Sequence, residues 1–274
     1  MHYLPSPAET RRMDTAELRD RFLLGDVFQP GRITLRFVDL DRVVIGGAVP
    51  SGGALRLEAP AEMAAEFFAE RREIGILNVG GGGSVTVDGE RFAMAFRDGL
   101  YVGRGAREVS FESDDAAEPA RFYLVSYPAH AAYPTTHVAH ADADATELGT
   151  VATANRRILR KYFHPGGVQT AQLVMGVTEL LEGSVWNTMP AHTHARRTEV
   201  YLYFRVPADA VVMHLMGEPD QTRHLVVRDG EVALSPGWSI HSGCGTASYS
   251  FCWAMGGENQ VFADMQGVAM DALR

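Results

Sequence analysis

The sequence is poor in cysteine and has no long apolar segment. Two cysteines, Cys244 and Cys252, occur in 274 residues, too few for a disulfide framework. Both lie in an apolar stretch, so we expect buried free thiols. No run of about 18 apolar residues is present, and the N-terminus lacks the apolar core of a signal peptide. These absences predict a cytoplasmic protein with no membrane partner.

Positive charge is also scarce. The chain has 25 Lys and Arg against 34 Asp and Glu, which gives a net charge of −9. No nucleic-acid partner is expected, because phosphate binding needs clustered Lys and Arg. A few basic side chains that converge in a pocket would still hold an anionic ligand. The basic doublets are scattered, and most are expected on solvated faces: Arg11-Arg12, Arg71-Arg72, Arg156-Arg157 and Arg196-Arg197.

Turn-forming residues are abundant instead. The 28 glycines and 13 prolines indicate many turns and many short strands. Asp88-Gly89 predicts a hairpin between 85–87 and 92–96, because these residues suit the positive φ angles of a tight turn. We expect a short helix over 15–24, capped by Thr15, and a second over 60–72. Residues 128–152 are expected to form a linker.

Short strand candidates occur on both sides of this linker, so the sequence predicts an all-β fold with a few short helices. Asp98-Gly99 followed by Gly103-Arg104-Gly105 resembles Asp229-Gly230 followed by Pro236-Gly237-Trp238. This repetition predicts a duplicated barrel, with one domain over 1–140 and another over 141–274. The main strand candidates are 33–37, 43–45, 121–126, 170–178, 200–204, 210–216, 224–227, 231–234 and 249–255.

The strongest chemical signal is a pair of histidines followed by a glutamate. His192 and His194 are two residues apart, so on a strand their side chains point to one face. A turn after His194 would bring Glu199, at the start of the next apolar run, beside them. His241 follows a Pro-Gly turn and is the best candidate for a fourth ligand. Three imidazoles and a carboxylate predict a site for Zn, Fe, Mn, Ni or Co.

This pattern resembles the two sequence motifs of the cupin superfamily. The first motif has His-x-His and then Glu, and the second has Pro, Gly and a His five residues after the Pro. Pro236 to His241 keeps that spacing, although the glycine is Gly237 and Trp238 occupies its usual place. Trp186 likewise stands where the first motif has a glycine. The resemblance is therefore to a divergent branch of a superfamily with many activities.

Longer segments resemble the 4-deoxy-L-threo-5-hexosulose-uronate ketol-isomerase (5-keto-4-deoxyuronate isomerase) family over nearly the whole chain. The resemblance implies a duplicated cupin (bicupin) subunit, a bound Zn²⁺ held by the four residues named above, and a homohexamer. It also implies isomerisation of 5-keto-4-deoxyuronate to 3-deoxy-D-glycero-2,5-hexodiulosonate during cytoplasmic degradation of pectin-like polysaccharides. The matching segments are 100–105, 128–130, 172–176, 187–204, 216–219, 222–224, 238–243 and 256–259.

A ketol isomerisation needs a Lewis acid, a base and a group that holds the substrate carboxylate. Zinc suits the first role because it does no redox chemistry. Glu258 is the candidate base. A carboxylate is best held by a cation, preferably a bidentate arginine. The candidate substrate-binding residues are Arg160, Lys161, Gln172, Tyr201, Tyr203 and Arg223.

The first half of the chain offers no equivalent ligand set. Gly80–Gly83 lies roughly where it would carry a His-x-His motif, and Glu108 lies near the position of the later histidine. No Lys-Ser/Thr follows the glycines, so they form no phosphate-binding loop. This half is expected to be structural.

Two alternative functions stay open from sequence: an iron-dependent cupin dioxygenase and a sugar-binding cupin without catalysis.

Overall fold

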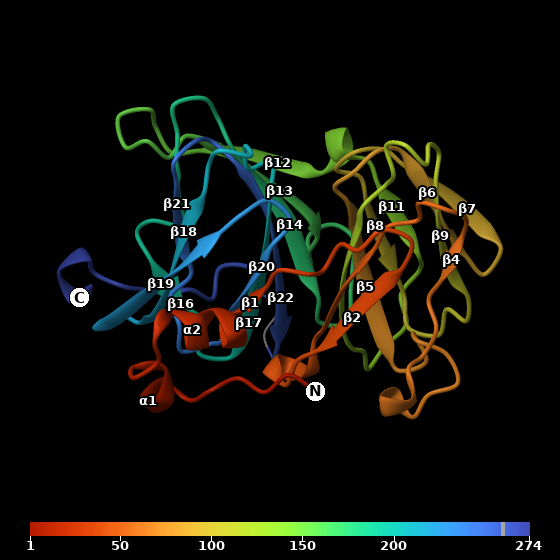
Figure 1. Ribbon diagram of the computed structural model, residues 1–274, viewed down its shortest axis with the longest axis horizontal. Helices are drawn as coiled ribbons and strands as arrows, with labels where there is room; N and C mark the ends of the chain where they lie inside the picture. The colour runs from red at the N-terminus through yellow and green to blue at the C-terminus, as the bar shows by residue number, and fades with distance from the viewer. Residues whose placement is uncertain (259–260) are drawn as a thin grey trace.

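Antiparallel strands form almost all the regular structure of the computed structural model, which describes residues 1–258 and 261–274. Each half of the chain contributes a large and a small sheet, and the two halves lie side by side in Figure 1. Asn259, part of the predicted C-terminal family segment, lies outside the described residues. The prediction of an all-β fold with few short helices is confirmed.

The first pair of sheets encloses an apolar core. Buried side chains from both sheets meet there, and the ring centroids of Phe111 and Phe122 lie 5.3 Å apart. The larger sheet has the order β11 (Thr136–Val138), β8 (Gly99–Val102), β5 (Arg72–Asn78), β10 (Phe122–Pro128), β3 (Val44–Ala48) and β2 (Ile33–Phe37). The smaller sheet has the order β4 (Leu55–Arg56), β9 (Val109–Ser113), β6 (Gly83–Val87) and β7 (Glu90–Met94).

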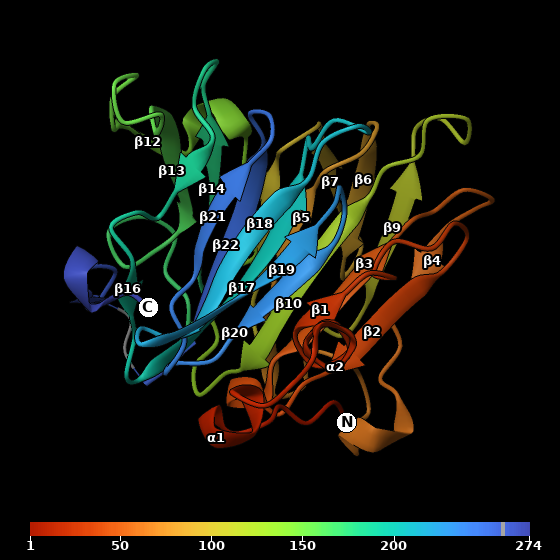
Figure 2. The same ribbon diagram turned by 60° about the vertical axis from the view of Figure 1, so that its left-hand side comes forward.

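The second pair of sheets repeats this plan in the C-terminal half (Figure 2). A separate two-stranded ribbon joins β16 (His192–Thr193) to β23 (Gln266–Gly267). The larger sheet has the order β1 (Leu23–Leu24), β20 (Val232–Ser235), β17 (Arg197–Phe204), β22 (Ser250–Gly257), β14 (Val174–Leu180), β13 (Arg157–Phe163) and β12 (Asp144–Leu148). The smaller sheet has the order β15 (Trp186–Asn187), β21 (Ser242–Gly245), β18 (Val212–Glu218) and β19 (Gln221–Val227).

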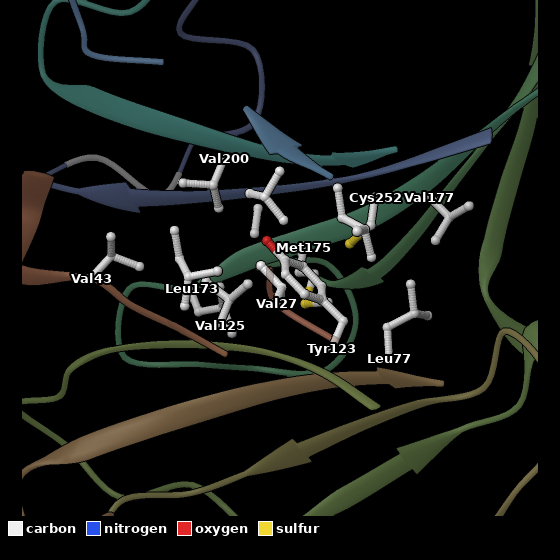
Figure 3. Close-up of a cluster of buried hydrophobic side chains, with 14 of the residues drawn as sticks. Val27, Val43, Leu77, Tyr123, Val125, Leu173, Met175, Val177, Val200 and Cys252 are labelled. Carbon is white, nitrogen blue, oxygen red and sulfur yellow. The ribbon is translucent and has the colours of Figure 1, made fainter. Parts of the chain in front are cut away.

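The two larger sheets pack against each other, which explains why their central strands are buried on both faces. In β17, Val200 and Leu202 face the core between the halves, whereas Tyr201 faces the interior of its own half. Figure 3 shows this shared core, where Tyr123 and Val125 of the first half meet residues of the second. Alternation along a strand therefore separates two apolar environments here, not core from solvent.

A buried carboxylate also joins the halves. Glu73 of β5 is fully buried and accepts backbone N–H groups of Ala171, Gln172 and Leu173 at 2.6–2.8 Å. The hydroxyl of Tyr101 donates to the same carboxylate at 2.8 Å. Four donors replace the water that the carboxylate loses on burial, so the contact stabilises the junction.

The N-terminal segment lies on the C-terminal half. In Figure 1 the red helices α1 (Pro7–Thr10) and α2 (Thr15–Phe22) lie beside teal and blue strands. β1 pairs with β20, and Phe22 packs edge-on against Trp238 with ring centroids 6.3 Å apart. The sequence prediction of this helix needs two corrections. Asp14, not Thr15, is the cap, and the helix ends at Phe22 because the next two residues pair as β1.

Local sequence signals succeeded where a turn decides the structure. The predicted hairpin is β6–β7, with Val87 opposite Glu90, and Asp88 and Gly89 have φ values of 48° and 89°. Both residues therefore adopt the left-handed conformation that such a two-residue turn requires. The strand predicted over 33–37 coincides with β2.

Two predictions from weak patterns were wrong. The predicted helix over 60–72 is only a 3-10 turn, Ala61–Met63, because Ala64 adopts a left-handed φ of 47° and Arg72 already begins β5. The predicted linker does connect the two halves, but it is not free of strands, since it contributes β11 to one half and β12 to the other.

None of the helices formed by the described residues has the length and apolar character needed to cross a bilayer. The remaining 3-10 turns are Leu40–Arg42, His140–Asp142 and Met270–Ala272.

Candidate metal centre

Four side chains from three chain segments converge inside the C-terminal half. His192 lies in β16, His194 follows it, Glu199 lies in β17 and His241 immediately precedes β21. One ligand atom of each lies within 4.8 Å of the others. The tertiary connection is the β17–β20 pairing, which places Glu199 opposite Ser235, so that the following turn returns the chain to deliver His241.

The donor atoms face one another closely. His192 Nε2 lies 3.1 Å from His194 Nε2 and 3.0 Å from His241 Nε2. Glu199 Oε1 lies 2.9 Å from His194 Nε2 and 3.6 Å from His241 Nε2. Ligands at about 2.0–2.1 Å from a tetrahedral metal are separated by roughly 3.3 Å. The donor set and its spacing therefore fit one divalent cation.

Burial shifts the proton affinity of these ligands. Burial, with His241 adding to it, lowers the pKa of His192 to about 3, and burial also lowers the pKa of His241. Burial acts to raise the pKa of Glu199, but the neighbouring imidazoles outweigh it and lower that pKa to about 2. At neutral pH His192 and His241 are thus neutral and Glu199 is a carboxylate, the protonation states that a metal needs.

A second carboxylate orients His194. Asp264 Oδ1 lies 2.9 Å from His194 Nδ1 and also accepts a hydrogen bond from Nη2 of the buried Arg197. A donor at Nδ1 leaves His194 Nε2 as the free ligand atom. Sequence reasoning missed this support, because Asp264 is 70 residues from His194 and no spacing rule links them. The sequence indicates only weakly that Arg197 takes part, because it is a charged residue next to an apolar strand candidate.

A cavity of about 270 Å³ opens beside three of these four residues, His192, His194 and Glu199. Its wall is mostly apolar, so it excludes water from bound molecules and strengthens electrostatic contacts within. The lining residues fall into three groups: the ligands His192, His194 and Glu199; the polar side chains Arg157, Thr178, Thr188 and Tyr201; and the apolar side chains Leu148, Leu159, Met189, Pro190, Phe251, Trp253, Met255, Phe262 and Met265.

The two predicted tyrosines have different surroundings. Tyr201 lines the cavity, and its phenol interacts with the side chains of Glu199 and Thr188. Tyr203 lies deeper inside the C-terminal half, where its hydroxyl is 2.8 Å from Nδ1 of the buried His214. Only Tyr201 is therefore placed for direct contact with a ligand in the cavity.

The structure does not bring the three predicted cations into the cavity lining. Arg160 pairs with Glu179 at 3.0 Å on the other face of the sheet. Lys161 pairs with Asp144 at 2.6 Å. Arg223 donates to the backbone oxygen of Arg11. Each of these side chains already has a partner.

Gln172 and Glu258 also lie outside the cavity lining. The Gln172 amide bridges the backbone, donating to Pro128 O at 2.5 Å and accepting from Gly257 N at 2.9 Å. Glu258 is exposed and forms a bidentate ion pair with Arg196. Arg196 is the primary cause of the lowered pKa of this carboxyl. The structure offers no contact between Glu258 and the metal ligands, so its catalytic role stays a prediction.

In the first half, Gly80–Gly83 and Glu108, the positions compared with the ligands, have structural or surface roles. A Cβ atom at Gly81 would stand 2.0 Å from the backbone oxygen of Glu118, so this glycine permits close backbone approach. Glu108 is at the surface and pairs with Arg56 at 2.6 Å. Within the described residues, the four-residue group in the second half is the one cluster with this ligand geometry.

Comparisons with known proteins identify similar sequences over nearly the whole chain. The sequence profile of the KduI/IolB family matches residues 29–270. A 4-deoxy-L-threo-5-hexosulose-uronate ketol-isomerase from Kineococcus radiotolerans is 56% identical over 99% of both chains. One of the same name from Opitutus terrae is 51% identical, over 100% of this chain and 99% of its own.

Solved structures resemble the fold at low sequence identity. An IolB-like protein from Salmonella typhimurium LT2 has a TM-score of 0.72 and 14% identity, covering 90% of this chain and 96% of its own. A cupin 2 conserved barrel domain protein from Leptotrichia buccalis has a TM-score of 0.51 and 10% identity, covering 89% of this chain and 98% of its own. The predicted duplicated cupin fold is confirmed.

Proposed function

Because this chain belongs to the KduI/IolB family, we propose that it is a zinc-dependent ketol-isomerase that converts 5-keto-4-deoxyuronate to 3-deoxy-D-glycero-2,5-hexodiulosonate. The family prediction and the assignment to the isomerases are confirmed by these relatives. The zinc, the cytoplasmic location, the role in pectin degradation and the homohexamer are parts of the proposal. The observation that carries it is the convergence of three imidazoles and one carboxylate beside an apolar cavity.

The reaction moves hydrogen between two adjacent carbons without net oxidation. The hydroxyl-bearing carbon next to the aldehyde loses a proton, the aldehyde carbon gains one, and the hydroxyl proton moves to the former aldehyde oxygen. When bound, a divalent cation supplies a Lewis acid for the negative charge that develops on that oxygen. Zinc fits because the donors are nitrogen and oxygen and the reaction needs no redox change.

The chain's own residues hold and shield the reacting end of the substrate. His192, His194, Glu199 and His241 would hold the cation. Asp264 fixes the orientation of His194 through Nδ1. Tyr201 brings a hydroxyl to the cavity next to Glu199, where it can hydrogen-bond a substrate oxygen. The apolar wall keeps bulk water from exchanging protons with the reacting carbons.

The decisive experiment follows the conversion by NMR in D₂O, using purified protein and 5-keto-4-deoxyuronate. We expect product formation that a chelator abolishes and that zinc restores better than iron. An oxygen electrode runs in parallel. Oxygen uptake that depends on the uronate would contradict the isomerase and indicate a dioxygenase. Binding without conversion at any metal loading would indicate a sugar-binding protein.

A further inference from the structure

One wall of the cavity carries an arginine that has no assigned role. Arg157 lies in β13, where it pairs with Leu180, and two residues later Leu159 pairs with Thr178. Leu159, Thr178 and Arg157 all line the cavity. Since side chains alternate along a strand, Arg160 points to the opposite face, where it meets Glu179. The strand therefore directs one arginine inward and another outward.

Arg157 has no carboxylate partner within the described chain. Its Nη1 donates to the backbone oxygen of Asn155 at 2.8 Å. The neighbouring arginines are used differently, because Arg156 pairs with Glu147 at 2.6 Å and Arg160 with Glu179 at 3.0 Å. Arg157 is also the one Lys or Arg among the described residues that line the cavity.

The surroundings of this guanidinium are unfavourable to an isolated charge. Its wall neighbours Leu148, Leu159 and Phe251 are apolar. Burial lowers the pKa of Arg157, although an arginine stays charged at neutral pH. A half-buried cation beside an apolar cavity needs an anionic partner, and the described residues supply none.

We propose that Arg157 binds the carboxylate of the uronate substrate and thereby sets which end of the sugar acid faces the metal ligands. This inference rests on the proposed function, because that function supplies the carboxylate. In the substrate the carboxylate and the reacting aldehyde occupy opposite ends of a six-carbon chain. A guanidinium presents two parallel N–H donors, which match the two oxygens of a carboxylate.

The positions of the strands agree with an end-to-end arrangement. Strand pairing runs from β13 through β14 and β22 to β17, and the registers set Ile158, next to Arg157, level with Phe204, which is five residues along β17 from Glu199. Arg157 and Glu199 therefore lie far apart along the wall of the one cavity that both line. An extended six-carbon acid is roughly 6 Å long, from bonds of about 1.5 Å. Such a chain is elongated enough to lie along the cavity, with its carboxylate toward Arg157 and its aldehyde toward His192, His194 and Glu199.

The test compares the uronate with its methyl ester, which keeps the shape of the acid but removes its charge. We expect Arg157→Gln to lower kcat/KM for the acid by roughly 10- to 100-fold and to leave kcat/KM for the ester nearly unchanged. Arg157→Lys keeps the charge without the paired donors, so its kcat/KM for the acid should lie between the values of the wild type and of Arg157→Gln. Arg156→Gln is the matched control, since it removes an exposed arginine one position away.

Metal content and thermal midpoint report whether each variant keeps its fold and its cation. Calorimetric titration with the uronate separates the two proposals. Wild-type binding that Arg157→Gln weakens, without any turnover, would support Arg157 and overturn the isomerase. Turnover with an unchanged preference for the acid in a folded, metal-loaded Arg157→Gln protein would overturn the role of Arg157 alone. Absence of both binding and turnover in the wild type would overturn both.

Discussion

The two halves of the molecule pack a large sheet against a small one, yet their interiors differ. The first interior is filled by apolar side chains such as Ile74, Ile76 and Phe111. The second contains Glu199 and His241, whose exposed fractions are 5% and 2%. Buried polar groups are stable only with partners, and the second half supplies these through a converging ligand set. One architecture thus serves as a support in the first half and as a site in the second.

The largest effect on the second half, and none on the first, is expected when one of the four converging side chains is removed. We expect His241→Ala to leave little bound metal and to lower kcat/KM by at least about 100-fold, since even outer-shell changes at metal sites cost 10–100-fold. The fold should persist, because the shared core between the halves does not include this side chain. Metal analysis by mass spectrometry and the NMR assay measure the two effects.

The matched change in the other half is Phe111→Ala. It removes a fully buried ring from the first core and should lower the free energy of unfolding by about 3–5 kcal/mol. The metal content per folded molecule and kcat should be unchanged. If folded Phe111→Ala protein lost its metal as His241→Ala does, the division between support and site would be wrong.

A weaker effect is expected when the support of one ligand is removed. Asp264→Asn takes away the charge that faces both His194 and the buried Arg197. Metal affinity should fall by about 10–100-fold, because the orientation of His194 is no longer fixed. Competition with a chelator of known affinity measures this loss. Asp271→Asn, at an exposed position of the same C-terminal segment, is the control and should bind metal normally.

The smallest expected effect concerns pH and again separates the halves. Burial lowers the pKa of His214 to about 3, so this histidine is neutral when folded and takes up a proton first in the unfolded chain. Its stabilisation is present above the ordinary pKa of about 6.5 and is lost as the pH falls toward 3. For metal-free protein we expect a loss of about 1 kcal/mol from His214 between pH 7 and pH 5.5.

Denaturant unfolding at the two pH values measures this loss. His214→Gln should reduce the pH dependence, whereas His130→Gln, at an exposed position of the first half, should leave it intact. An equal pH dependence in His214→Gln and the wild type would show that His214 does not carry it. Among the described residues of the first half no histidine is fully buried, so the larger loss is expected in the second half.

Sequence reasoning identified the four side chains that converge in the candidate metal centre, because spacing along strands and turns restricts where side chains point. His192 and His194 share a face by alternation, and the Pro-Gly turn before His241 has few alternative conformations. The same reasoning misplaced a helix over 60–72, because alanine and glutamate favour helix only when no tertiary contact overrides them. Arg157 was grouped with surface doublets, since nothing local distinguishes it from Arg156.

The sequence by itself determined the strand-rich fold, the tight hairpin at Asp88-Gly89 and the residue types that converge as ligands. These follow from interactions over a few residues. Only the tertiary structure decided that Asp264 supports His194, that Glu73 joins the halves and that Arg157 faces the cavity. Such contacts depend on which strands become neighbours, and that choice is made by burial summed over both sheets, not by any short pattern.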